Sequence, residues 1–194
     1  MAGIIDIPME EVRDNSFRLA RTLVKENIFP TIIYAVTRGG VYVANPISEY
    51  YNYIGKEPRY GVVNAYSYKG IGQQSKVVIE GWVPSLEDIT EKDRVLIVED
   101  VIDSRKSIEA ILADIEEKTP LKRDVKLPPS ERRILIAVHD FKLRYDIEDM
   151  PKTRPDFFAK KWVIGSEEEK VWLNYLSHEL VGLTEKQVME RYGI

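Results

Sequence analysis

The chain has 194 residues, 44% of them apolar and 31% charged, which fits one folded globular domain and excludes a disordered or fibrous protein. With no cysteine and only two histidines, it cannot form disulfides or use a cysteine nucleophile, and a metal site of several histidines is not expected. The net charge of −4 gives no general attraction to nucleic acid. Residues 1–10 do not resemble a signal peptide and no run approaches about 18 apolar residues, so we expect a cytoplasmic protein that does not enter membranes.

The N-terminal half of the chain alternates between helical and strand patterns. Apolar residues at three- and four-residue spacing predict helices over residues 9–26 and 41–52. Short apolar runs rich in β-branched residues predict buried strands at 31–36 and 60–66. Residues 77–83 alternate more regularly between apolar and polar types, which predicts an antiparallel or edge strand.

The C-terminal half continues this alternation. Buried strands are predicted at 94–98 and 133–138, with a helix over 107–118 between them. Residues 167–180 and 184–192 are helical by pattern, and Thr184-Glu185-Lys186-Gln187 has the form of a helix-starting capping box. Strand–helix alternation predicts an α/β fold with a mostly parallel twisted sheet flanked by helices. We expect a single domain over residues 1–194, with a C-terminal helical elaboration from about residue 166 onward.

A polar loop with adjacent acids follows the strand predicted at 94–98. The free N–H groups of the helix that begins there, with serine hydroxyls and basic side chains, suit a phosphate group. Two carboxylates just before such a loop suit a sugar diol or Mg²⁺. Taken singly, each residue fits a simple helix cap as well as it fits a phosphate site. The residues of this candidate ribose 5-phosphate site are Glu99, Asp100, Asp103, Ser104, Arg105, Lys106 and Ser107.

A second candidate anion site follows the strand predicted at 31–36. Thr37, Arg38, Gly39 and Gly40 occupy the turn there. Paired glycines allow a tight turn and a close approach of the backbone to an anion, and Arg38 adds a charged clamp. The motif is short, and in isolation it more often marks an ordinary turn.

Val95–Ser107 resembles the motif of type I phosphoribosyltransferases that binds 5-phosphoribosyl 1-pyrophosphate (PRPP). In that motif four hydrophobic residues and two acids precede Asp-Thr-Gly-Lys-Thr, and this chain has Asp103-Ser104-Arg105-Lys106-Ser107 with Arg105 in the glycine position. The resemblance implies that Glu99 and Asp100 face the ribose hydroxyls and Mg²⁺, and that the loop holds the 5-phosphate. It also implies that Asp103 lies near N7 of a purine as general acid or base.

Further segments are similar to the 6-oxopurine enzymes of this family. The resemblance implies that the Thr37–Gly40 turn binds pyrophosphate, and that the Thr37–Arg38 peptide is a candidate for a cis bond. Ser67, Tyr68 and Lys69 begin a glycine-containing stretch that is either a plain hairpin connection or the family's mobile catalytic loop.

The same resemblance implies a base pocket under a small hood. Lys142, shortly after the strand predicted at 133–138, would donate to the exocyclic oxygen O6. Trp162, downstream of Pro155-Asp156-Phe157-Phe158, would stack on the purine, and the backbone of Val163 would read the base edge. An isolated tryptophan is otherwise more often an ordinary core residue.

The function implied is Mg²⁺-dependent transfer of the phosphoribosyl group of PRPP to a purine, most similar to purine salvage of a 6-oxopurine. Mg²⁺ is the cofactor, and PRPP and the purine are the partners. Adenine as the base, and a non-catalytic regulator that senses PRPP or a nucleotide, remain alternatives. The aromatic side chains of Tyr50, Tyr51 and Tyr53 lead us to expect a homodimer.

Overall fold

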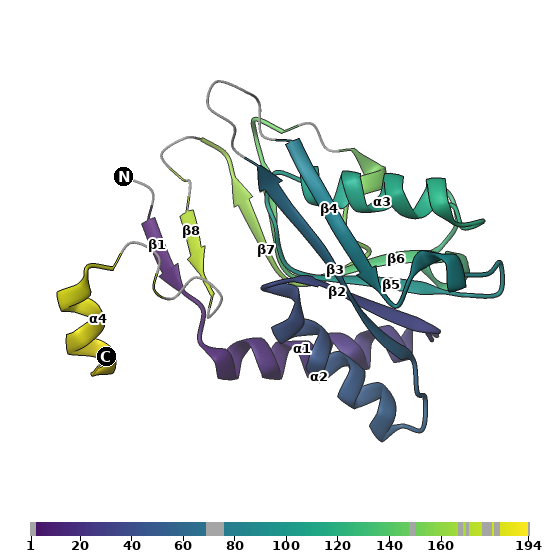
Figure 1. Ribbon diagram of the computed structural model, residues 1–194, viewed down its shortest axis with the longest axis horizontal. Helices are drawn as coiled ribbons and strands as arrows, with labels where there is room; N and C mark the ends of the chain where they lie inside the picture. Colours follow the sequence, from purple (N-terminus) through teal and green to yellow (C-terminus); the bar gives the residue numbers. More distant parts are fainter. Residues whose placement is uncertain are drawn as a thin grey trace.

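The protein is represented by a computed structural model, which describes residues 3–68, 76–147, 150–166, 169, 171–175, 180 and 183–193. Within these residues, the main sheet has six strands in the order β4-β3-β2-β5-β6-β7 (Figure 1). The strands are β2 (Ile32–Thr37), β3 (Arg59–Tyr68), β4 (Lys76–Val83), β5 (Val95–Ile102), β6 (Ile134–Arg144) and β7 (Phe157–Ile164). Neighbouring strands run parallel except for β3 and β4, so β4 is the antiparallel edge strand that the sequence predicted.

Helices cover both faces of this sheet. The helices α1 (Met9–Lys25) and α2 (Gly40–Tyr53) lie on one face, and α3 (Lys106–Lys118) lies on the other (Figure 1). Short 3₁₀ turns occupy Leu86–Asp88, Pro129–Glu131 and Pro151–Thr153. The expected α/β fold with a mostly parallel sheet flanked by helices is therefore confirmed.

The central strands are apolar along their whole length because both of their faces are covered. Ile33 and Leu96 pack into the core cluster beneath α1 and α2, whereas Ile32 and Ile97 pack into the cluster beneath α3. Alternate residues of one strand thus enter opposite layers, as the two-residue period of a strand requires. Because β2, β5 and β6 run parallel, their carboxyl ends lie at one edge of the sheet.

A second, smaller sheet joins the two ends of the chain. In the described residues, β1 (Gly3–Asp6) pairs in parallel with β8 (Val171–Asn174), and α4 (Glu185–Tyr192) follows (Figure 1). The helix predicted over 167–180 is therefore wrong at β8. Val171, Leu173 and Tyr175 face inward while Trp172 is half exposed, which is strand alternation over a span too short to separate from a helical pattern.

Two further expectations and two omissions of the sequence analysis can be compared with the structure. The capping box predicted at Thr184 is present, with the Thr184 side chain accepting a hydrogen bond from the Gln187 backbone N–H. Sequence patterns did not predict β1 or β7. Tyr51, expected at an interface, is fully buried, and its hydroxyl donates to the Ile28 carbonyl oxygen, because it continues the apolar face of α2.

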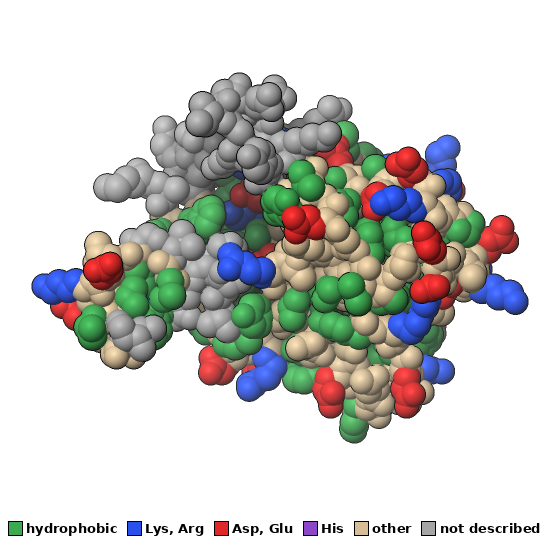
Figure 2. All heavy atoms as spheres, viewed as in Figure 1, with side chains coloured by type: hydrophobic (Ala, Val, Ile, Leu, Met, Phe, Trp, Pro, Cys, Tyr) green, Lys and Arg blue, Asp and Glu red, His purple; other side chains and the backbone are tan. Residues whose placement is uncertain are grey.

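Surface properties fit the composition. On the face shown in Figure 2, acidic and basic side chains of the described residues are interspersed over the main domain. Among the helices of the described residues, none is long and apolar enough to cross a membrane.

Asp156 organises the amino ends of β6 and β7. Its buried carboxylate accepts hydrogen bonds from Arg123 Nη1 at 2.7 Å, from Arg132 Nη1, and from the Ile136 backbone N–H at 2.7 Å. Arg123, itself 1% exposed in its side chain, also donates to three backbone carbonyls. Parallel strands begin at this edge, so the Pro155-Asp156 motif lies at the end of the sheet opposite the acidic pair and supports the fold.

Asp156→Asn should lower the free energy of unfolding by about 3–5 kcal/mol, because it leaves a buried guanidinium without its counter-charge. Urea unfolding followed by circular dichroism measures this. Asp124→Asn, at an exposed position nearby, should stay within about 0.5 kcal/mol of the parent protein. A similarly small effect of Asp156→Asn would contradict the structural role.

Candidate functional site

The predicted pyrophosphate turn and the predicted acidic pair line one cavity at the carboxyl edge of the sheet, whereas Asp103–Ser107 are not among its lining residues. This cavity has a volume of about 410 Å³. Thr37, Arg38 and Gly39 line it from the end of β2, and Glu99 and Asp100 line it from the end of β5. The structure therefore brings the predicted pyrophosphate turn and the predicted acidic pair together, which the sequence alone could not show.

Close packing explains the paired glycines. A Cβ atom on Gly39 would lie 1.8 Å from Asp100 Oδ2, and one on Gly40 would lie 2.5 Å from the Val98 carbonyl oxygen. Glycine is thus required for the start of α2 to lie against β5. The Thr37–Arg38 peptide is cis, as expected, and the Thr37 hydroxyl donates to Asn64 Oδ1 at 3.0 Å.

The acidic pair is buried, with Glu99 9% and Asp100 5% exposed. The Asp100 backbone N–H donates to Glu99 Oε1 at 3.1 Å, and the Val101 N–H donates to Asp100 Oδ1 at 2.9 Å. Burial, followed by the adjacent charge of Asp100, raises the pKa of Glu99 well above its ordinary value. A divalent cation in the cavity would relieve this repulsion. Two carboxylates are also the usual protein share of a Mg²⁺ site completed by substrate phosphates, so the residues fit Mg²⁺.

The phosphate loop joins β5 to α3. Ser104 and Lys106 are exposed and Ser107 is half-buried at the start of the helix, where free backbone N–H groups favour an anion. Arg105 has φ +62°, in the left-handed region that glycine adopts readily. Its side chain is 3% exposed, and the guanidinium carbon lies 5.6 Å from the centroid of the Phe141 ring. Arg105 therefore keeps the backbone conformation suited to the loop, while its charge is turned into the core.

Asp103 lies between two cations from the end of β6. Lys142 Nζ donates to Asp103 Oδ2 at 3.1 Å, and Arg144 Nη1 donates to Asp103 Oδ1 at 2.8 Å. Lys142 also donates to the Val171 carbonyl oxygen at 2.9 Å, so β8 covers this part of the site. The Asp103 side chain stays 37% exposed, which leaves it accessible to a ligand.

Arg144 is a site residue that sequence reasoning missed. Two hydrogen bonds to Asp146, together with the one to Asp103, raise its pKa above the ordinary arginine value, so it is a fixed cation. A signal was present in the sequence. Lys142 and Arg144 are two residues apart on one strand, so they point to the same face.

The remaining predicted residues lie around this centre. Trp162 of β7 is the strand neighbour of Lys142, and its indole N–H donates to Asp140 Oδ1 at 2.6 Å. Val163 is 66% exposed, and the predicted role of its backbone in reading the base edge stays a prediction. Ser67 and Tyr68 end β3, whereas Lys69 and the rest of the predicted mobile loop to residue 75 lie outside the described residues.

A family model described as a phosphoribosyl transferase domain matches residues 8–127, more than half of the chain. The protein therefore belongs to the phosphoribosyltransferase family, as the sequence motif predicted, and the family implies PRPP and a base as substrates. A search of curated proteins found no match.

Similar solved structures agree with this family. A purine phosphoribosyltransferase from Pyrococcus horikoshii Ot3 has a TM-score of 0.63 and 22% identity, covering 94% of this chain and 98% of that one. A xanthine-guanine-hypoxanthine phosphoribosyltransferase from Helicobacter pylori has a TM-score of 0.62 and 19% identity, covering 90% and 93%. A hypothetical protein from Neisseria gonorrhoeae with bound ppGpp has a TM-score of 0.63 and 17% identity, covering 90% and 89%. These likenesses show the type I phosphoribosyltransferase fold.

Alanine at the two glycines should have separable effects. Gly40→Ala meets backbone, so α2 must shift from β5, and we expect a loss of about 1–3 kcal/mol in urea unfolding. Gly39→Ala meets the Asp100 side chain, so we expect it to displace that carboxylate and weaken PRPP binding in calorimetric titrations with Mg²⁺. Gly81→Ala, which meets nothing within 4 Å, is the control. Unchanged PRPP affinity in Gly39→Ala would show that the position of Asp100 is not critical.

Proposed function

We propose that the protein transfers the 5-phosphoribosyl group from PRPP to a 6-oxopurine, in a Mg²⁺-dependent reaction of purine salvage that gives the nucleoside monophosphate and pyrophosphate. The contact between Lys142 Nζ and Asp103 Oδ2, 3.1 Å, carries this proposal. Lys142 is the residue expected to recognise the base, and Asp103 begins the loop expected to hold the ribose 5-phosphate. The contact places the two side by side. Recognition of both substrates at one point is what a transfer between them requires.

The residues divide the work of binding PRPP. The N–H groups at the start of α3, with the hydroxyls of Ser104 and Ser107 and the charge of Lys106, would hold the 5-phosphate. Arg38 and the turn before α2 would hold the pyrophosphate. Glu99 and Asp100 would hold Mg²⁺, which when bound supplies positive charge to the departing pyrophosphate.

The transfer forms a bond from a purine nitrogen to C1′ as the bond from C1′ to the pyrophosphate oxygen breaks. The purine gives up one proton in the process, and the Asp103 carboxylate is placed to accept it. Lys142 and Arg144 hold Asp103 in place through both of its oxygens. Positioning and charge stabilisation carry the reaction in this proposal, and no covalent nucleophile is needed.

The choice of a 6-oxopurine follows from the charge of Lys142. An ammonium group donates to an oxygen such as O6, but it cannot accept from the exocyclic amine of adenine. An adenine amine would leave a hydrogen-bond donor of Lys142 without an acceptor. Because Lys142 is only 5% exposed, water could not replace that acceptor. The named xanthine-guanine-hypoxanthine enzyme with this fold supports the same class of base, and the named purine enzyme supports a purine.

Turnover of PRPP and Mg²⁺ with hypoxanthine, guanine, xanthine and adenine tests the proposal. We expect nucleoside monophosphate from at least one 6-oxopurine and none from adenine. Turnover with adenine alone would overturn the assignment of Lys142. No turnover with any base would overturn the enzymatic proposal. Nucleotide binding in that case would favour the sensor alternative; the fold neighbour from Neisseria gonorrhoeae has ppGpp bound.

Asp103→Asn should reduce turnover more than PRPP binding, because it removes the proton acceptor but keeps the shape of the loop. We expect kcat to fall by about 10²–10⁴-fold with the calorimetric affinity for PRPP nearly unchanged. Asp146→Asn is the matched control, since it removes the other carboxylate bound to Arg144 and leaves the loop intact. Equal losses of turnover and affinity in Asp103→Asn would instead assign the residue a structural role.

A further inference from the structure

A buried carboxylate lies beside the proposed base pocket without having been assigned a role. The side chain of Asp140 is 0% exposed. Among the described residues it accepts hydrogen bonds from Trp162 Nε1 at 2.6 Å, from His139 Nδ1 at 2.7 Å, and from the Tyr175 hydroxyl. Burial acts to raise the pKa of Asp140, but these hydrogen bonds outweigh it and lower the pKa below its ordinary value. The carboxylate is therefore ionised, with its charge held by hydrogen bonds.

The donors of this cluster are fixed in turn by their own partners. Arg18 Nη1 donates to Asn15 Oδ1 at 2.9 Å, which directs the Asn15 amide nitrogen toward His139 Nε2, 3.2 Å away. His139 Nε2 then accepts, so the proton of a neutral ring lies on Nδ1 and points to Asp140. A chain of hydrogen bonds thus runs from the surface of α1 to the carboxylate and makes its position rigid.

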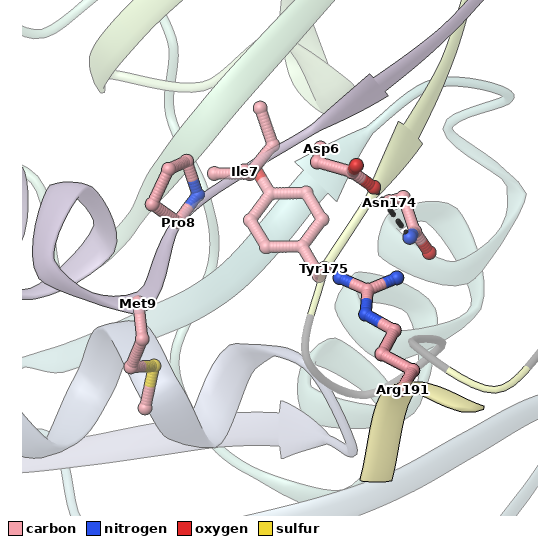
Figure 3. Close-up of a pocket in the computed structure, with 7 residues that line it drawn as sticks. All are labelled: Asp6, Ile7, Pro8, Met9, Asn174, Tyr175 and Arg191. Atoms are coloured by element: carbon pink, nitrogen blue, oxygen red, sulfur yellow. Dashed lines mark hydrogen bonds between the residues drawn. The ribbon is translucent and has the colours of Figure 1, made fainter. Parts of the chain in front are cut away.

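Tyr175 connects the same carboxylate to the C-terminal segment and to the acidic pair. Its hydroxyl lies 3.1 Å from the Asp100 carbonyl oxygen as well as against Asp140. Its ring lines a separate cavity of about 170 Å³ beside β1 and β8, with the Asp6–Asn174 hydrogen bond next to it (Figure 3). Burial, then the charge of Asp140, raises the pKa of Tyr175, so the hydroxyl keeps its proton and donates.

Trp162 is the member of this cluster that the family resemblance places as the stacking surface for the purine. It is partly buried against the core beneath α1 and α2, and it is the strand neighbour of Lys142. A tryptophan ring held only by packing can turn about its side-chain bonds, whereas the bond from its N–H to a fixed carboxylate sets the plane of the ring. A fixed plane lowers the entropic cost of stacking a flat base.

We propose that Asp140 is a positioning residue for the base: its carboxylate orients the ring of Trp162 as the stacking surface for the purine. This inference rests on the proposed function and deepens it, because it assigns the specificity of that pocket to a residue that does not itself touch the substrate. Asparagine at position 140 keeps the size of the side chain but presents an N–H group to at least one donor, so it cannot hold all of these groups at once.

The chain contains a matched control for this interaction. Trp82 Nε1 donates to Asp114 Oδ2 at 2.7 Å, a bond of the same kind and similar length, and Trp82 packs against the core cluster beneath α3. Asp114→Asn therefore removes an indole–carboxylate bond remote from the proposed base pocket. Both variants lose an indole–carboxylate hydrogen bond. An effect on base binding that appears in Asp140→Asn but not in Asp114→Asn is therefore due to the place of the bond beside the proposed pocket, and not to a general loss of stability.

The kinetic test measures KM for the base, KM for PRPP and kcat in Asp140→Asn, Asp114→Asn and Trp162→Phe. We expect the KM for the base to rise about tenfold in Asp140→Asn, as loss of one hydrogen bond to a charged group implies, with kcat and the KM for PRPP within about twofold. Trp162→Phe keeps an aromatic face without the N–H and should raise the same KM, and the double variant should not add the two effects. Asp114→Asn should match the parent protein.

A spectroscopic test does not depend on turnover. In ¹⁵N-labelled protein, the indole N–H signals of Trp82 and Trp162 are assigned from their phenylalanine variants. We expect GMP to shift the Trp162 signal but not that of Trp82, and Asp140→Asn to speed hydrogen exchange at Trp162 alone. A Trp162 signal that GMP leaves unchanged, or an unchanged KM for the base in folded Asp140→Asn, would overturn the inference. Absence of turnover in the parent protein together with a GMP-induced shift would overturn only the proposed transfer reaction.

Discussion

The start of α2 lies directly against the end of β5, and the geometry of the cavity depends on this contact. Gly39 and Gly40 are both needed, since a Cβ on the first would overlap the carboxylate of Asp100 and a Cβ on the second would approach the Val98 carbonyl. The contact brings Arg38 and the acidic pair to one cavity, although about sixty residues separate them in the chain. An anionic ligand between them would therefore meet a cation from one strand end and carboxylate-bound metal from its neighbour.

The phosphate loop shows how a departure from a family motif can preserve its backbone. A left-handed residue other than glycine costs roughly 1–2 kcal/mol, and Arg105 adopts that conformation. The buried stem of the side chain and the contact of its guanidinium with Phe141 offset part of this cost, the latter by about 0.5–2 kcal/mol. The sequence showed the substitution but not the direction of the side chain. Arginine in the glycine position is thus compatible with the backbone conformation of the loop.

Sequence patterns predicted the parts of the fold that depend on local periodicity. The buried strands and the three helices around them were evident from apolar runs and spacing, and so was the cap at Thr184. The edge strand β7 was missed because Lys160 and Lys161 interrupt its apolar pattern, and β8 was mistaken for helix because it is very short. The anion loops were predictable since each follows a strand directly. The contacts of Asp140 with Tyr175 join residues 35 positions apart and have no local signature.

The contacts of Lys142 show how the site can be organised before a base arrives. An ammonium group has three N–H donors, and in the described residues Lys142 uses one on Asp103 and one on the Val171 carbonyl. In the proposed function, this third N–H would donate to O6 of the base while both contacts remain. Asp103 meanwhile keeps Arg144 as a second partner, so proton transfer to its carboxylate need not release it from the loop. In the proposed function, the side chains that meet the purine would be held by β6, β7 and β8 together, so β8 would contribute to recognition although it is short.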